Sequence, residues 1–64
     1  RPTTLLDAEV ELVRRVLRFE HPAERVVADF VREQPALGAR DRRVLADGVF
    51  ALLRKLSLFR HLAA

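Results

Sequence analysis

Apolar residues recur along the chain at the spacing of helices rather than strands. Between residues 5 and 19 they fall three or four positions apart, which gathers them on one face of a helix. The core set is Leu6, Val10, Val13 and Leu17, widened by Leu5, Leu12, Val16 and Phe19. Thr4 suits the N-cap, and Asp7, three residues on, gives a start resembling a capping box. The pattern predicts a first helix over residues 5–19.

A second helix is predicted over residues 22–34. His21-Pro22 marks its start, because proline is favourable at a first helical position, where its missing N–H would have had no partner. The residue before Pro35 resists the α conformation, so the helix should end near Gln34. Its apolar face consists of Ala23, Val26, Val27, Phe30 and Val31.

A third and longer helix is predicted over residues 40–62. Its main apolar face follows a four-three spacing through Leu45, Val49, Leu52, Leu56 and Phe59. Gly48 inside this face weakens the helix by roughly 1 kcal/mol relative to alanine. We interpret Gly48 as structural, a place where another helix passes close by. Ser57 is the point at which a separate, fourth helix would begin.

The third segment is apolar on a second side as well. Val44, Leu58 and Leu62 lie on that side, and a helix apolar on two sides needs two neighbours. Two short helices cannot easily cover both. We therefore expect Val44, Leu58 and Leu62 to be docking residues of an incomplete part of a larger domain, or of a chain that self-associates.

Length and composition narrow the fold class. The chain has 64 residues, half of them hydrophobic and a third charged, which fits one helical domain over residues 1–64. The absence of cysteine excludes disulfides and thiolate metal sites. No apolar run approaches the roughly 20 residues of a membrane span. The prediction is an all-α bundle of three to four helices in orthogonal arrangement, with no membrane partner.

Arginine dominates the charge, with eleven Arg and one Lys against nine acids and a net charge of +3. By helical geometry Arg40, Arg43 and Arg54 project within about 60° of one another on the third segment. With Lys55 they form a candidate site for a phosphate backbone. A solvated face with local pairs, such as Arg43 with Asp47, explains the same pattern. The residues alone leave both readings open.

Other positions point to structure rather than chemistry. Arg42 projects towards the apolar side, and we predict that it pairs with an acid or with helix-end carbonyls across the junction. Asp41 favours the start of the helix, and Gly38 belongs to the tight connection before it. Ser57 has no acid beside it, His21 and His61 lie at opposite ends, and there is no phosphate-binding glycine loop. The chain is not expected to be an enzyme on its own or to hold a metal or cofactor.

Three blocks carry a family resemblance: HPAERV at residues 21–26, REQPALGARDRR at 32–43 and VLADGVFALLR at 44–54. Together they resemble the amino-terminal region of the RsmB (Sun/Fmu) family of bacterial 16S ribosomal RNA cytosine-5 methyltransferases. The similarity covers about residues 22–62. The LG-x-RDR turn at 37–42 and the AxxVFxxLR helix at 46–54 are its most specific parts. Residues 5–19 fit only as a generic first helix.

The resemblance implies a fold like that of NusB, an RNA-binding antitermination factor, placed before a catalytic domain that binds S-adenosylmethionine. It implies a cytoplasmic, accessory role in which Arg40, Arg43, Arg54 and Lys55 contact ribosomal RNA. One alternative is a structural domain that docks on the catalytic domain of the same chain. A second is a helix-turn-helix DNA binder that uses the third helix for recognition. Against it, the connection before that helix exceeds the usual turn of 3–4 residues.

Overall fold

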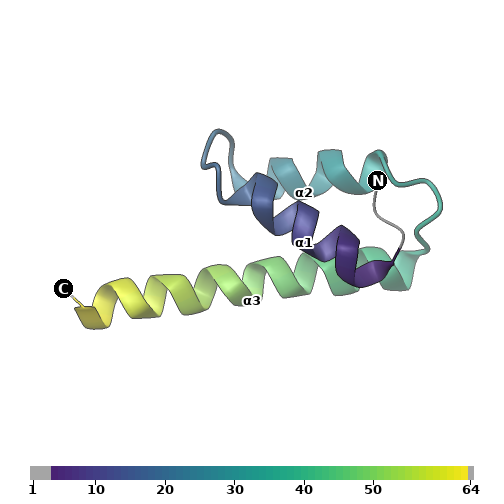
Figure 1. Ribbon diagram of the computed structural model, residues 1–64. Helices are drawn as coiled ribbons and strands as arrows, with labels where there is room; N and C mark the ends of the chain where they lie inside the picture. The colour runs from purple at the N-terminus through teal and green to yellow at the C-terminus, as the bar shows by residue number, and fades with distance from the viewer. Residues whose placement is uncertain (1–3, 64) are drawn as a thin grey trace.

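The computed structural model describes residues 4–63, which form three helices and, within that range, no strand. They are α1 (Leu5–Val16), α2 (Ala23–Arg32) and α3 (Ala39–Ala63). The predicted all-α class is confirmed. α1 packs against both α2 and α3, whereas α2 and α3 barely contact each other. Figure 1 shows α1 crossing in front of the other two helices, while one end of α3 runs on past them.

α1 begins as predicted and ends three residues earlier than predicted. The Thr4 hydroxyl accepts a hydrogen bond from the Asp7 backbone N–H at 3.1 Å, which is the expected N-cap. Leu17 caps the other end, and Phe19 follows with a φ of 56°. That left-handed conformation cannot continue a right-handed helix. The apolar pattern ran on to residue 19 because Leu17 and Phe19 line a groove instead of extending α1.

α2 and α3 match their predicted ranges within one or two residues, apart from one predicted break. Pro22 is the N-cap of α2 rather than its first residue, and its carbonyl accepts from the backbone N–H of Arg25 and Val26. α2 stops at Arg32, before Pro35, as the restricted residue ahead of a proline requires. α3 continues through Ser57 without interruption, so the fourth helix is not formed.

The core is small and lies where α1 crosses the other two helices. Its buried members are Ala8, Leu12, Val16, Val27, Phe30, Leu45 and Val49. The prediction of which α1 residues face the core was wrong in part, since Leu6 and Val10 are exposed. α1 carries two neighbouring apolar stripes, and periodicity alone does not say which one meets a neighbour. The stripe with the small residue Ala8 lies inside, because a methyl group lets the helix axes approach closely.

α3 falls into two parts. Residues 39–53, the covered part, contain Leu45 and Val49 in the core and Leu53 packed against it. Residues 54–63, the projecting end, extend beyond α1 and α2 (Figure 1). Along that projecting end only Leu56 is half-buried among the residues whose burial is described. Within residues 4–63, no helix combines the length and apolarity needed to cross a membrane.

Candidate nucleic-acid interface on α3

The start of α3 fixes the first cations of the candidate interface. The backbone N–H of Arg42 donates to the Gly38 carbonyl at 3.0 Å and closes the first turn. Asp41 lies in that turn, half-buried, where its negative charge complements the helix dipole as predicted. Gly38 has no positive φ, and an added Cβ would meet nothing within 4 Å. Its place in the tight connection therefore does not depend on its being glycine.

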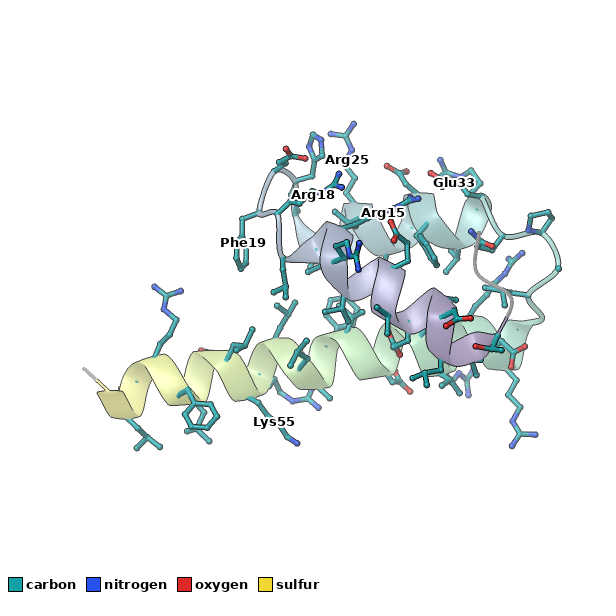
Figure 2. The ribbon with its side chains drawn as sticks, in the orientation of Figure 1. Arg15, Arg18, Phe19, Arg25, Glu33 and Lys55 are labelled. Carbon is teal, nitrogen blue, oxygen red and sulfur yellow. The ribbon has the colours of Figure 1, made fainter. Side chains whose placement is uncertain are left out.

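The predicted RNA-contacting residues Arg40, Arg43, Arg54 and Lys55 are all exposed. By helical geometry the first three lie about 180° round α3 from the buried Leu45 and Val49, so they face away from the core. Lys55 is displaced from Arg54 by about 100°, towards a neighbouring face. Figure 2 shows Lys55 pointing away from α1 and α2. The candidate stripe is therefore Arg40, Arg43 and Arg54, with Lys55 at its edge.

Of the four arginines of α1 and α2, Arg15, Arg25 and Arg32 have acidic partners, while the exposed Arg14 has none among the described residues. Arg25 and Arg32 both pair with Asp29, at 3.9 and 3.3 Å. Within residues 4–63 no ion pair reaches Arg40, Arg43, Arg54 or Lys55, and the predicted local pair between Arg43 and Asp47 is absent there. Exposed ion pairs contribute little to folding, but they do neutralise charge locally. The guanidinium groups of the stripe are therefore unpaired in this range, with the exposed Asp47 as the one acid on the same face between Arg43 and Arg54.

Arg15 was not predicted to be a functional residue, yet among the described residues it is the cation with both two ion pairs and a contact with an aromatic ring. Its guanidinium donates to Glu11 at 3.2 Å and to Glu33 at 2.9 Å, and lies 5.0 Å from the centre of the Phe30 ring. The hydrogen bond to Glu33 is the main cause that raises the pKa of Arg15. Because Glu33 is eighteen residues away, no local spacing could have revealed this tie between α1 and α2.

Arg42 does not make the contact that its position suggested. Its side chain is exposed, and no ion pair joins it to another residue in the range 4–63. The predicted pairing across the helix junction is therefore not formed in this structure. Arg42 contributes to the start of α3 through its backbone N–H, which donates a hydrogen bond to the Gly38 carbonyl.

Gly48 is approached by another helix, as predicted, but through a side chain. The carboxyl group of Glu9 on α1 lies over it, so that an added Cβ would stand 3.1 Å from the Glu9 Cδ and closer still to Oε1. The Oε2 atom of Glu9 is buried without a hydrogen-bond partner. This burial raises the pKa of the Glu9 carboxyl, because desolvation disfavours its charged form.

The predicted docking residues Val44, Leu58 and Leu62 are exposed. They lie on the second apolar side of α3, which neither α1 nor α2 covers. Leu58 and Leu62 are neighbours one turn apart, whereas Val44 lies about 21 Å from Leu58 along the helix. The structure leaves these side chains exposed, and their docking role stays a prediction.

The two histidines lie in separate parts of the structure. His21 lies in the loop between α1 and α2, and His61 lies in the last turn of α3. Among residues 4–63 no three His, Asp or Glu side chains are grouped as metal ligands. His21 borders an open depression of about 180 Å³ that also contains Arg15, Arg18, Asp29 and Glu33. Arg15, Asp29 and Glu33 are held there in ion pairs.

Comparison with known proteins found no relative of this chain. No protein-family model matches the chain, and no curated protein or solved structure is similar to it at the level required for a match.

Proposed function

We propose that the chain is an accessory RNA-binding domain of an S-adenosylmethionine-dependent ribosomal RNA cytosine-5 methyltransferase. In this role it holds ribosomal RNA for a catalytic domain that carries the cofactor and the reacting groups. The proposal rests on the resemblance at residues 21–54 and on one observation. The cations of the α3 stripe are exposed and have no acidic partner within residues 4–63.

The geometry of the stripe suits a phosphate backbone. Arg40 and Arg43 lie one turn apart, and Arg54 follows about 16 Å further along the helix from Arg43, given a rise of about 1.5 Å per residue. An arginine guanidinium binds phosphate oxygens through two parallel hydrogen bonds, and it stays charged at any physiological pH. A stripe of this kind positions RNA without reading its bases. Positioning is what an accessory domain supplies to a separate catalytic centre.

A docking role is the second candidate, and the exposed Val44, Leu58 and Leu62 favour it. In that case the domain braces the catalytic domain of the same protein and touches RNA little. The two roles differ in their dependence on salt. Phosphate contacts weaken steeply as salt rises, whereas apolar docking does not.

The helix-turn-helix alternative receives less support. Six residues separate α2 from α3, since α2 ends at Arg32 and α3 begins at Ala39. Helix-turn-helix motifs use a turn of 3–4 residues between helices that pack on each other. Here α2 and α3 barely touch, because α1 lies across both.

The experiment is an amide NMR titration of the 64-residue chain with a short stem-loop of ribosomal RNA, at low and at moderate salt. We expect shifts that concentrate on Arg40, Arg43, Arg54 and Lys55 and diminish with salt. Replacing Arg43 with glutamine should reduce the slope of log K against log salt by about 0.7–0.9, the value for one lost phosphate contact. Arg32→Gln is the control, because it removes the same charge from α2, where the exposed Arg32 is paired with Asp29.

Equal weakening by Arg43→Gln and Arg32→Gln would assign the binding to net charge and contradict a defined interface. A spectrum that RNA leaves unchanged would exclude the RNA role. Binding of the separate catalytic domain, resistant to salt and lost in Leu62→Ser, would then establish the docking role. Selective binding to one DNA duplex would establish the third.

A further inference from the structure

An apolar groove lies between the end of α1 and the projecting end of α3. It has a volume of about 570 Å³ and is open to solvent. Its lining comes from both sides, namely Leu17, Phe19, Leu53, Leu56, Ser57, Phe59 and Arg60. Figure 2 shows Phe19 reaching from the α1–α2 loop towards α3. The groove lies on the opposite side of α3 from the Arg40, Arg43 and Arg54 stripe, so it is independent of the proposed RNA contact.

The helical seam of α3 continues into this groove. Leu45 and Val49 belong to the four-three seam and are buried under α1. Leu52 and Leu56 continue it half-buried, and Phe59 ends it 71% exposed. Residues at this spacing form a ridge along the helix, and such a ridge packs into the grooves of a second helix. α1 packs on the first part of this seam, Leu45 and Val49. The second part, Leu56 and Phe59, has the same spacing and can pack on another helix in the same way.

Phe19 provides a second and independent observation. Its φ of 56° places it in the left-handed region, which costs a bulky residue of order 1–3 kcal/mol and favours glycine or asparagine. Phe19 is 73% exposed, so packing within the described residues offsets little of this cost. An aromatic side chain kept in a strained conformation on the rim of a groove is typical of a binding residue.

The charge around the groove identifies the kind of helix. After Asp47 the chain contains no acid, while Arg54, Lys55, Arg60 and His61 all lie on or beside the projecting end. Arg60 itself lines the groove. A second copy of this end laid in the groove would bring like charges together. An acidic helix would place its carboxylates beside Arg60 and the other cations of the projecting end, which gives the complementary potentials of specific interfaces.

We propose that this groove binds an amphipathic helix with acidic flanks, which inserts large apolar side chains between Phe19 and Phe59. The apolar face of that helix completes the seam that α1 leaves open beyond Leu53. Its flanking carboxylates face Arg60 and the neighbouring cations. This is the helix-in-groove mode of recognition, with anchors at i, i+3 or i+4 and i+7.

The test is fluorescence anisotropy of the 64-residue chain with a labelled peptide of about 20 residues, long enough to form a helix on binding. The peptide carries leucine and phenylalanine anchors at i, i+4 and i+7 and glutamate on both flanks. A control peptide has lysine in place of each glutamate. We expect the acidic peptide to bind at least about tenfold more tightly, a difference of about 1.4 kcal/mol.

Two groove variants and one control variant locate the binding in the groove. Phe59→Ser should weaken it about tenfold or more, whereas Leu62→Ser, at a position 72% exposed and outside the groove lining, should change it less than about twofold. Phe19→Gly removes the rim but relieves the strained backbone. It should weaken binding while leaving the unfolding midpoint unchanged or higher.

Four results would overturn the proposal. The first is equal binding of the acidic and basic peptides, and the second is equal effects of Phe59→Ser and Leu62→Ser. The third is a dimer in sedimentation equilibrium that dissociates in Phe59→Ser, which would make a second copy the occupant. Absence of any binding by the acidic peptide would overturn it as well.

Discussion

The two parts of α3 have the same helical pattern and different surroundings. In the covered part, residues 39–53, Leu45 and Val49 are buried beneath α1. In the projecting end, residues 54–63, Leu58, Phe59 and Leu62 are mostly exposed. The four-three spacing runs through both parts without a change. Apolar periodicity therefore predicted the helix along its whole length, while the reach of α1 decided which apolar residues form a core.

The two parts differ in charge as well. The covered part carries Asp41 and Asp47 among its arginines, while the projecting end has cations only. An apolar surface surrounded by charge of one sign discourages self-pairing and favours a complementary partner. The covered part of α3 therefore holds the fold, while the projecting end carries the residues that are available for binding.

The largest expected effect is a contrast between two leucine truncations. Leu45→Ala removes a fully buried side chain and should lower the free energy of unfolding by about 2–5 kcal/mol. That is comparable to the roughly 3–5 kcal/mol a domain of this size obtains from its core. Leu56→Ala should cost less than about 1.5 kcal/mol, because its side chain is only half-buried. Urea denaturation measures both, and equal losses would show that the two parts are equally packed.

Hydrogen exchange should reveal the same boundary without any substitution. Amides at residues 44–52 exchange only when the core opens, whereas those at residues 57–63 lie in a helix that lacks tertiary support. Isolated helices of that length are marginal in water. We expect protection to be at least about tenfold lower in the projecting end, measured by native-state exchange under NMR. Uniform protection along α3 would mean that a neighbour already covers this end.

Gly48→Ala should stabilise the protein by up to about 1 kcal/mol. Alanine favours the interior of a helix over glycine by that amount. The added Cβ meets the tip of the Glu9 side chain rather than a backbone, and that flexible carboxylate can swing out to solvent. Thermal unfolding measures the change. A loss of stability would show that Glu9 is held firmly in place and that Gly48 is required for close helix packing.

The smallest expected effect concerns the charge of Glu9. Its pKa is raised in the folded state, so folding favours the protonated form and stability falls as pH rises through that raised value. Glu9→Gln should therefore stabilise the protein at neutral pH. The gain should vanish below the ordinary pKa near 4.5, where Glu9 is protonated in both states. Denaturation of both proteins from pH 7 to pH 4 tests this, with Glu20→Gln as the control, because Glu20 is exposed and forms no ion pair within residues 4–63.

Most of the helical framework could be predicted from local sequence. Thr4 and Pro22 marked the starts of α1 and α2, and Pro35 marked the end of α2, because capping and proline restrictions act over a few residues. The early end of α1 could not be predicted, since Leu17 and Phe19 continue its apolar pattern. Likewise, nothing local distinguished the exposed Leu6 and Val10 from the buried Leu12 and Val16.

The candidate site shows the same division. The angular relation of Arg40, Arg43 and Arg54 follows from helix geometry, which is the same for any α-helix. That these cations lack acidic partners within residues 4–63 depends on where other side chains lie, and only the structure gives it. The groove beside Phe19 and Phe59 is formed by residues forty positions apart, so no sequence spacing indicated it.

By itself the sequence determined three helices, the composition of their apolar faces and the placing of the α3 cations, because these follow from backbone geometry over a few neighbouring residues. The tertiary structure decided the rest: which apolar stripe of α1 faces the core, how Arg15 joins α1 to α2, and at which residue α3 extends beyond its contact with α1. Those outcomes depend on how far one helix reaches along another, and that distance is set by packing between segments that are remote in the chain.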